Sequence, residues 1–250
     1  MMRKLLLTTG LMLILALTAA GVSRAQERLP IAFGQWVEGS ISDEATDVRY
    51  VFAGTQGQLI LVEMIPRPGT FDLDPALVLR DSDGDILGSN NDFSYRSGLS
   101  MVVAELPSTE DYVILATRAG GRDGDSHGDY WLRVTPVQPL AAGSKVEITL
   151  TSDYEQRAPS VFVMRPAASG PLTLGFSQRP SPVFPGFEFS QWRDDDTPLS
   201  LLDVASTAGV TNATVAMNVE GGKIYALVIS LSDYAYTETP EQATVTFGLN

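Results

Sequence analysis

The sequence predicts an all-β protein: two tandem antiparallel β-sandwich domains, jelly-roll-like in pattern, that follow a signal peptide. Apolar and polar residues alternate with a period of two through most of the chain after residue 25, as they do in half-buried strands. No segment of that region shows the roughly ten residues of helical periodicity that a helix requires. The strand pattern also recurs at a nearly constant spacing, which indicates two copies of one domain.

Residues 1–25 have the features of a secretory signal peptide. Arg3 and Lys4 precede the apolar run Leu5–Ala20, and Ser23-Arg24-Ala25 places small residues where a signal peptide is cut. An uncleaved membrane anchor is the alternative, although the run is shorter than the roughly 20 residues that span a bilayer. No cysteine follows the run, so a lipoprotein cleavage site is absent. We expect a secreted or periplasmic protein whose mature chain does not insert into a membrane.

The composition excludes several kinds of site. The 250 residues include no cysteine and one histidine, which rules out disulfides, thiolate nucleophiles, cysteine-based metal centres and intrachain sites with two imidazoles. The net charge is −13, and it becomes −16 once the leader with its three basic residues is removed. Nucleic acids and anionic lipids are bound through Lys and Arg, so we expect neither as a partner.

The first domain is expected over residues 26–137. Eight short runs with strand patterns are separated by Gly, Pro, Asp, Asn and Ser, a spacing typical of an antiparallel sandwich or jelly roll. The runs are Gln35–Ile41, Val48–Phe52, Leu59–Met64, Ala76–Arg80, Ile86–Gly88, Met101–Glu105, Tyr112–Thr117 and Tyr130–Thr135.

The second domain is expected over residues 138–250, after the segment Thr135–Pro139, which suits a short linker. Gly34 and Val37 match residues of this domain at an offset of 109, and later positions match at 111 and 113. The later matches pair Tyr50 and Phe52 with Val161 and Val163, Leu59 and Leu61 with Leu172 and Leu174, and Tyr112 with Tyr225. Each copy is long enough to bury its own core without disulfides.

A series of short motifs runs in order through residues 30–135. The motifs are Gly39, Asp47–Phe52, Gly57-Gln58-Leu59, Phe71-Asp72-Leu73-Asp74-Pro75, Asp83-Gly84, Asn91-Asp92, Asp111–Ile114 and Gly128–Leu132. Together they resemble the bacterial pre-peptidase C-terminal domain, a secreted jelly-roll module found beside extracellular peptidases. The resemblance implies an accessory, binding or secretion-assisting role. The second domain is a divergent copy, because the stretch from Pro180 to Asp203 has no counterpart of the Phe71–Pro75 motif.

Gly124–Gly128 matches the G-x-S-x-G pattern of serine hydrolases. That chemistry needs the serine on a strand-to-helix turn and a histidine from elsewhere in the chain. Here a strand pattern follows, and the single histidine, His127, is the direct neighbour of Ser126. We therefore predict a polar loop, no catalytic residues and no enzymatic activity.

Two groups of acidic residues are candidate calcium sites. The first choice is a corner formed by Asp72 and Asp74 at the start of one strand and Asn90, Asn91 and Asp92 at the end of the next, provided that the two strands form a hairpin. Three carboxylates and two amides there could supply the six or seven oxygen ligands that Ca²⁺ takes at about 2.4 Å. The alternative is that these Asp and Asn side chains cap backbone turns.

The second choice is the tip of the same hairpin. Asp81, Asp83 and Asp85 alternate around Gly84, as carboxylates do in hard-cation loops. The alternative interpretation is a β-turn in which Gly84 adopts positive φ. No other cofactor is expected.

An unusual Pro-rich and aromatic segment follows residue 179. Phe184, Phe187, Phe189 and Trp192 are candidates for an apolar surface that contacts a sugar or protein partner. The alternative is a rigid connector.

These observations predict a secreted, non-catalytic binding or accessory protein of the bacterial envelope or exterior. It would recognise a protein or polysaccharide partner through sandwich loops, with calcium as a candidate stabilising ion. Two alternatives stay open: an extracellular hydrolase that uses carboxylates or a metal, and a structural subunit of an envelope complex.

Overall fold

The computed structural model describes residues 27–67, 73–91, 93, 98–151, 159–178, 185–192, 199–205, 212–231 and 242–249. These residues form seventeen strands and one 3-10 helix, η1 (Gly121–Asp123), so the predicted all-β fold is confirmed. The signal-peptide prediction falls on residues outside the described ranges. No helix within those ranges is long and apolar enough to cross a bilayer.

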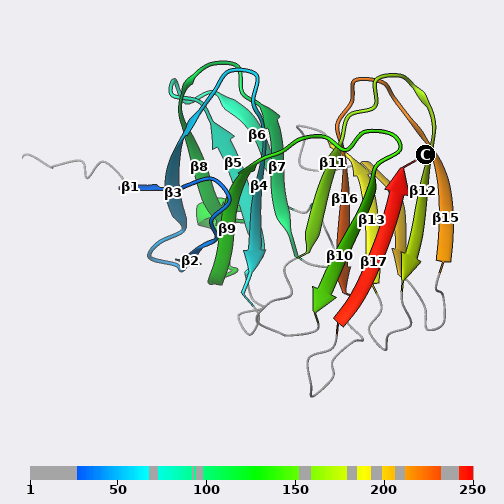
Figure 1. Ribbon diagram of the computed structural model, residues 1–250. Helices are drawn as coiled ribbons and strands as arrows, with labels where there is room; N and C mark the ends of the chain where they lie inside the picture. The colour runs from blue at the N-terminus through cyan, green and yellow to red at the C-terminus, as the bar shows by residue number, and fades with distance from the viewer. Residues whose placement is uncertain are drawn as a thin grey trace, which may run out of the picture.

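Strands β1 to β9 form the first sandwich, from two sheets (Figure 1). Outer sheet 1 has the order β1-β3-β8-β5-β6 and inner sheet 1 the order β2-β9-β4-β7. The strands are β1 Arg28–Pro30, β2 Val37–Ile41, β3 Asp47–Gly54, β4 Leu59–Pro66, β5 Pro75–Arg80, β6 Ile86–Asn90, β7 Ser100–Glu105, β8 Glu110–Arg118 and β9 Gly128–Pro136. All eight expected runs overlap strands, and β1 is an additional strand that pairs in parallel with β3.

Strands β10 to β17 form the second sandwich. Inner sheet 2 has the order β11-β16-β13-β14 and outer sheet 2 the order β10-β17-β12-β15. The strands are β10 Lys145–Thr151, β11 Ser160–Met164, β12 Gly170–Gln178, β13 Pro185–Gln191, β14 Leu199–Ala205, β15 Asn212–Val219, β16 Tyr225–Leu231 and β17 Gln242–Leu249.

The second sandwich repeats the strand order of the first. Inner sheet 1 becomes outer sheet 2 when β2, β9, β4 and β7 are replaced by β10, β17, β12 and β15. Outer sheet 1, without β1, becomes inner sheet 2 when β3, β8, β5 and β6 are replaced by β11, β16, β13 and β14. Strand β13 therefore stands in the place of β5, although it lies in the stretch that lacks the Phe71–Pro75 motif.

Each sandwich has its own apolar core. The first core includes Tyr50 and Tyr130, whose hydroxyl oxygens lie 3.0 Å apart in a hydrogen bond, so neither buried phenol lacks a partner. The second core includes Phe189 and Tyr225, whose rings are stacked with centroids 5.5 Å apart.

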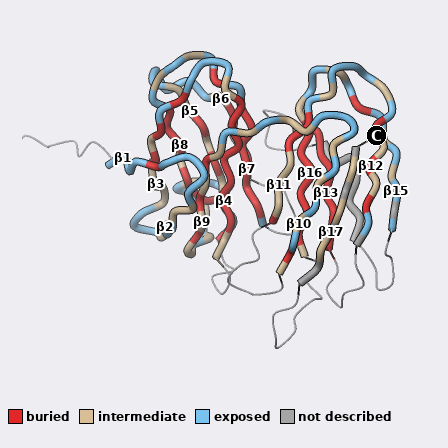
Figure 2. Tube along the Cα trace, viewed as in Figure 1, coloured by how far each residue is buried: buried red, intermediate tan, exposed pale blue. Residues whose placement is uncertain are grey.

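A third apolar cluster lies between the sandwiches, where inner sheet 1 packs on inner sheet 2. Its members include Leu61, Met101, Val163, Ala226 and Val228, each at most 3% exposed. The layers are therefore stacked as outer sheet 1, inner sheet 1, inner sheet 2 and outer sheet 2. In Figure 2 the buried strands gather in the middle of this stack. The two facing sheets are not equivalent in strand order, so the sandwiches do not meet through corresponding sheets.

This packing shows that the repeat matches in two strands, β3 with β11 and β4 with β12, are out of register. Leu61 faces the second sandwich, whereas Leu174, its match at offset 113, faces its own core. Phe52 faces its own core, whereas its match Val163 faces the first sandwich. A shift of one residue moves every side chain of a strand to the other face, so the strands correspond but the residues matched in them do not.

The segment between the sandwiches is tied to both of them. The Val137 N–H donates to the Leu59 carbonyl at 2.9 Å, and the Leu140 N–H donates to the Val163 carbonyl at 2.8 Å. These bonds bring the chain from the end of β9 across to the edge of inner sheet 2.

Candidate functional site

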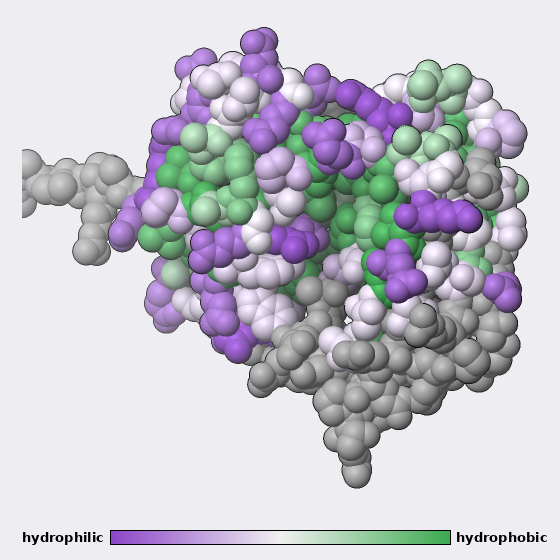
Figure 3. Space-filling model, in the orientation of Figure 1, coloured by the Kyte–Doolittle hydropathy of each residue, from purple (hydrophilic) through white to green (hydrophobic). Residues whose placement is uncertain are grey.

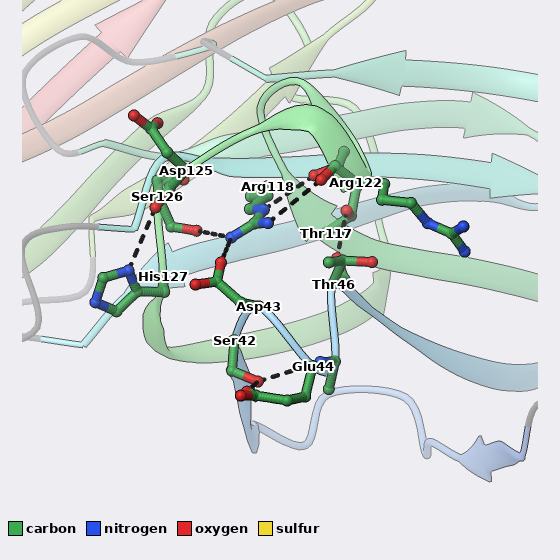
Figure 4. Close-up of polar contacts among 12 residues, drawn as sticks. Ser42, Asp43, Glu44, Thr46, Thr117, Arg118, Arg122, Asp125, Ser126 and His127 are labelled. Carbon is green, nitrogen blue, oxygen red and sulfur yellow. Dashed lines mark hydrogen bonds and ion pairs between the residues drawn. The ribbon is translucent and has the colours of Figure 1, made fainter.

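A buried arginine holds the loops at one end of the first sandwich (Figure 4). Arg118, the last residue of β8, is 3% exposed. Its Nη1 donates to the Asp43 carboxylate and to the Ser126 carbonyl, both at 2.9 Å, and its Nε donates to the Gly121 carbonyl at 2.9 Å. The Arg118 hydrogen bond and charge hold the pKa of Asp43 below its usual value. Because the guanidinium is engaged on several sides, Arg118 organises these loops.

The G-x-S-x-G segment lies in the same loops and lacks the contact that a serine nucleophile needs. Among the described residues the buried Ser126 hydroxyl has no hydrogen-bond partner. His127 Nδ1 instead lies 3.3 Å from the Asp125 carbonyl oxygen (Figure 4). Strand β9 begins directly after this segment, at Gly128. Serine and histidine are therefore not arranged as nucleophile and base.

The hairpin tip is a hydrogen-bonded turn. Asp81 Oδ1 accepts the Asp85 N–H at 2.8 Å, and the Asp81 carbonyl accepts the Gly84 N–H at 3.2 Å. Gly84 has φ of +93°, as the turn interpretation requires. Arg80 Nη1 donates to the Gly84 carbonyl at 2.7 Å, which places a cation beside the loop. Asp83 is exposed, and nothing in this arrangement gathers the three carboxylates around one point.

At the open end of the hairpin, the Asn90 side chain is turned into the protein. Asn90 is 1% exposed, and its Oδ1 accepts the Met101 N–H at 3.1 Å. The Ser100 hydroxyl donates to the Asn90 carbonyl at 2.7 Å. Asn90 therefore joins the end of β6 to the start of β7, and its amide oxygen, predicted as a calcium ligand, is already used by the backbone.

The remaining predicted corner residues are only partly described. Asp74 is exposed, and its carbonyl accepts the Ala119 N–H at 2.9 Å. Asn91 borders a shallow depression of about 440 Å³ on outer sheet 1. Asp72 and Asp92 lie outside the described residues. Among the described residues no group of three His, Cys, Asp or Glu side chains is placed to hold a metal ion. Calcium at this corner stays a prediction.

Two of the predicted partner-binding aromatics lie in the second core. Phe187 and Phe189 are 4% and 0% exposed and belong to strand β13, every residue of which is buried. The prediction that these two rings form an exposed contact surface is wrong, because inner sheet 2 is covered on both faces. Phe184 lies outside the described residues.

Trp192, the fourth predicted aromatic, lies at the junction of the two sandwiches. Its ring centroid is 6.0 Å from that of Phe93, and its backbone N–H donates to the Ile224 carbonyl at 2.9 Å. A groove of about 340 Å³ beside it is crossed by an ion pair between Arg165 and Glu105 at 2.8 Å. The boundary between the two halves is hollowed in Figure 3, with an apolar floor and a hydrophilic rim. Trp192 therefore joins the domains and borders a groove.

A group of aromatic and charged residues that sequence reasoning missed lies on inner sheet 1. We call it the Trp–Arg surface; it consists of Trp36, Glu38, Glu63, Arg67, Trp131 and Arg133. Trp131 and Arg133 alternate along β9 and so share one face, with Glu38 of β2 opposite Trp131 and Glu63 of β4 opposite Arg133.

Cations and rings are stacked on this surface. The Arg133 guanidinium carbon lies 4.2 Å from the centre of the Trp36 ring, and that of Arg67 lies 5.6 Å from the centre of the Trp131 ring. Arg67 also pairs with the exposed Glu38 at 3.2 Å. The pairing of β9 with β2 and β4 fixes Trp131, Glu38 and Glu63 relative to one another, and Trp36 lies directly before β2.

Glu63 is the buried member of the surface. Its Oε2 accepts from Arg133 Nε at 2.9 Å and from Nη2 at 2.7 Å. Its Oε1 is buried and has no hydrogen-bond partner among the described residues. Burial raises the pKa of the Glu63 carboxyl above its usual 4.5, and the charge of Arg133 opposes that rise.

Signals for this region are present in the sequence. Strand β4 is almost entirely apolar, which indicates burial on both faces rather than on one. In β9, Trp131 and Arg133 occupy the positions between the core residues Tyr130, Leu132 and Val134, where a solvated strand carries small polar side chains. An aromatic residue at a strand position that alternation assigns to the polar face is the signal that could have located the surface.

Comparisons with known proteins return only distant likenesses. No family model matches the chain, and no curated protein matches it. The chain is similar to the pre-peptidase C-terminal domain of a collagenase from Bacillus anthracis, with 14% identity and a TM-score of 0.37. The likeness covers 45% of this chain and 98% of that domain.

Two further solved structures are similar over most of the chain. One is a protein from Eubacterium rectale described as secreted, with 12% identity and a TM-score of 0.27 over 86% of this chain and 73% of that one. The other is the tandem CBM22-1–CBM22-2 domain of Xyn10C from Paenibacillus barcinonensis, with 8% identity and a TM-score of 0.24 over 79% of this chain and 82% of that one. Similarity at this level does not assign a ligand, so the function must come from the residues of this chain.

Proposed function

We propose that this chain is a non-catalytic binding protein of the bacterial envelope or exterior that recognises an uncharged glycan through the Trp–Arg surface. The observation that carries the proposal is the stacking of Arg133 on Trp36 and of Arg67 on Trp131 on one sheet face. Sites for small ligands combine aromatic surface with a few fixed polar groups, and this surface supplies both.

The chemistry of the surface favours a sugar over an ion. The buried Glu63 neutralises Arg133 and the exposed Glu38 neutralises Arg67, so the surface has no net attraction for an anion or a cation. Arginine N–H groups donate and the exposed Glu38 carboxylate accepts, which matches the hydroxyl groups of a sugar. Arg67 and Arg133 each lie over one indole ring, and the parts of the two rings that stay uncovered offer apolar area to the C–H face of a pyranose. Trp131 and Arg133 stand on β9, and Trp36 and Arg67 directly adjoin the ends of β2 and β4, so the groups are in position before the ligand arrives.

The non-catalytic part of the proposal is supported by the polar groups of the described residues. Ser126 and His127 do not form a nucleophile–base pair, and Glu63 is held by Arg133 in an ion pair. A glycosidase needs two carboxyl groups that flank a bound sugar, one of them free to protonate it. Glu63 is fully buried, so its carboxyl group does not reach the surface.

Affinity electrophoresis of the mature protein tests the proposal. Native gels containing hydroxyethylcellulose, laminarin or soluble xylan would be compared with a gel that contains no polysaccharide. We expect at least one polysaccharide to retard the wild type and Trp131→Ala to weaken that retardation about tenfold, because the half-buried ring of Trp131 is lost from the surface. Phe33→Ala, which removes an exposed aromatic outside the Trp–Arg surface, is the control and should migrate as the wild type. If no polysaccharide retards the wild type, glycan recognition is ruled out in favour of a protein partner.

A further inference from the structure

We propose that the open edge of β7, in the groove between the two sandwiches, binds an extended segment of a partner protein, which adds to inner sheet 1 as a further strand. The site is separate from the Trp–Arg surface, because β2 and β7 are the opposite edges of that sheet. The proposal does not depend on glycan binding. It rests on main-chain groups of β7 that lack a partner, on the apolar groove beside them and on the charge of that groove.

The directions of the main-chain groups of β7 follow from the residues at its two ends. In an antiparallel strand the N–H and C=O groups of successive residues point alternately to one side and to the other. Just after β7, the Leu106 N–H donates to the Gln58 carbonyl at 2.9 Å, toward the segment that leads into β4. Just before β7, the Leu99 carbonyl accepts the Phe93 N–H at 3.0 Å, on the other side. The even-numbered residues of β7 therefore bond to β4, and the odd-numbered residues face away from the sheet.

Only the first part of this edge is covered by the protein itself. The Met101 N–H donates to Asn90 Oδ1 at 3.1 Å. Among the described residues, no further hydrogen bond reaches the N–H and C=O of Val103 or the N–H of Glu105. Val103 is 2% exposed, and main-chain groups of buried residues are nearly always paired. This part of the edge therefore lacks the main-chain partner that an added strand supplies.

The groove of about 340 Å³ at the junction of the sandwiches lies along this part of β7. Residues 103–105 line one side of it, and residues 222–224 of the second sandwich line the other. Leu87 and Trp192 add apolar surface. Every second side chain of a strand points the same way, so an extended segment bonded to β7 can direct alternate apolar side chains at Leu87 and Trp192. The groove therefore matches an extended polypeptide in both its main-chain and its side-chain contacts.

The far wall of the groove is already in place without a partner. The Gly222 N–H donates to the Pro166 carbonyl at 2.7 Å, and Gly222 has the positive φ of +78° that its turn requires. The backbone N–H of Trp192 donates to the Ile224 carbonyl at 2.9 Å, which holds the start of the indole side chain against this wall. A partner therefore meets a site that needs little ordering.

The charge of the groove favours a segment that contains Asp or Glu. Arg165 and Glu105 form an ion pair across the groove, and because they are 42% and 47% exposed the pair costs little to open. Lys223 also lines the groove, is exposed and forms no ion pair with a described residue. The groove thus keeps one uncompensated positive charge in a chain whose net charge is −13. A carboxylate on the partner complements it.

A second copy of this chain fits the edge less well than a single strand does. The boundary between the sandwiches is hollowed and has a hydrophilic rim (Figure 3). The β7 edge of a second copy lies in the same kind of recess, so the rims of the two molecules would meet before their edges could pair. A segment without a fold of its own can enter the recess.

One substitution at the edge tests the proposal with a matched control. Glu105→Pro removes one N–H from the edge and spares the bonds to β4, because the main chain of Glu105 faces away from β4. Glu105→Ala loses the same ion pair with Arg165 and keeps the N–H. The two variants should have nearly equal melting temperatures, because proline is tolerated at such an edge position.

Random decapeptides displayed on phage would be selected on the immobilised mature wild type, and the most enriched peptide would be synthesised. We expect it to alternate apolar and polar residues and to contain Asp or Glu. Its Kd, measured by calorimetry, should rise about tenfold for Glu105→Pro, the effect of one lost hydrogen bond, and stay within about twofold for Glu105→Ala. Bound peptide should also slow amide hydrogen exchange at Val103 and Glu105 and leave Val102 and Ala104 unchanged.

Failure to enrich any peptide overturns the proposal, and so does a peptide that binds Glu105→Pro as tightly as the wild type. If the wild type self-associates in sedimentation velocity and Glu105→Pro does not, a second copy pairs with β7 and the proposal is wrong. Loss of polysaccharide retardation in Glu105→Pro would assign the groove to a sugar instead. Trp131→Ala should bind the peptide as the wild type does, so failure of the glycan site and failure of this site are distinguished.

Discussion

The residue type that a position tolerates in this protein depends on the side chains that pack against it. Gly39 is an example: a Cβ there would lie 2.3 Å from the ring of Tyr130, which is buried in the first core. The Tyr130 hydroxyl is held by Tyr50, so the ring cannot swing away freely. The sequence marks Gly39 only as part of a family-like motif, and the structure supplies its physical reason.

We expect Gly39→Ala to destabilise the protein by about 2 kcal/mol, the usual size of an overpacking penalty. For a chain of this length that lowers the melting temperature by about 6 °C. Gly175→Ala makes the same change inside a strand with open space, and it should leave the melting temperature unchanged or higher. Thermal unfolding followed by circular dichroism measures both, and equal melting temperatures for the two variants would contradict the steric explanation.

The buried Glu63 carboxyl group should make the stability of the protein depend on pH. Burial raises its pKa in the folded protein above 4.5, although Arg133 opposes the shift. The folded state therefore holds the proton more tightly than the unfolded state, so the contribution of Glu63 to stability is complete below pH 4.5 and is lost as pH rises through the folded pKa. Glu63→Gln cannot lose that proton. The melting temperature of the wild type minus that of Glu63→Gln should fall between pH 4 and pH 8, and Glu147→Gln at an exposed site is the control.

At the scale of elements, strand positions followed from alternation and turn residues, because both are local. All eight runs expected in the first sandwich overlap strands. Alternation did not predict which face of a strand meets which layer. The match of Leu61 with Leu174 pairs the correct strands, but the two side chains lie on opposite faces. Which face of a fully apolar strand meets which layer depends on a partner sheet distant in sequence.

The hairpin β5–β6 carries the calcium prediction. We expect EDTA to lower the melting temperature of the wild type, since an ion at 100 times its Kd adds about 2.7 kcal/mol of stability. Asp74→Ala should abolish this shift. Asp83→Ala should keep it, because the tip is already closed as a turn by Asp81 and Arg80. If EDTA does not change the melting temperature of the wild type, the protein has no stabilising calcium site.

At the scale of the whole molecule, the apolar layer between the sandwiches should make them unfold together. Differential scanning calorimetry of the mature protein should show one transition. Leu61→Asp places a charge in that layer while both cores stay intact, and it should separate the trace into two transitions. Its neighbour Ile60 points into the first core, so Ile60→Asp should instead unfold the first sandwich. One unchanged transition in Leu61→Asp would show that the layer does not couple the domains.

The sequence by itself determined the all-β class, the strands of the first sandwich and the turn at Asp81–Asp85, because alternation, glycine and turn residues act over a few positions. Only the tertiary structure decided that Phe187 and Phe189 are buried, and that two tryptophans and two arginines meet on inner sheet 1. These facts depend on how four sheets stack, and stacking energy comes from side chains far apart in the chain, whose pairing no local pattern contains.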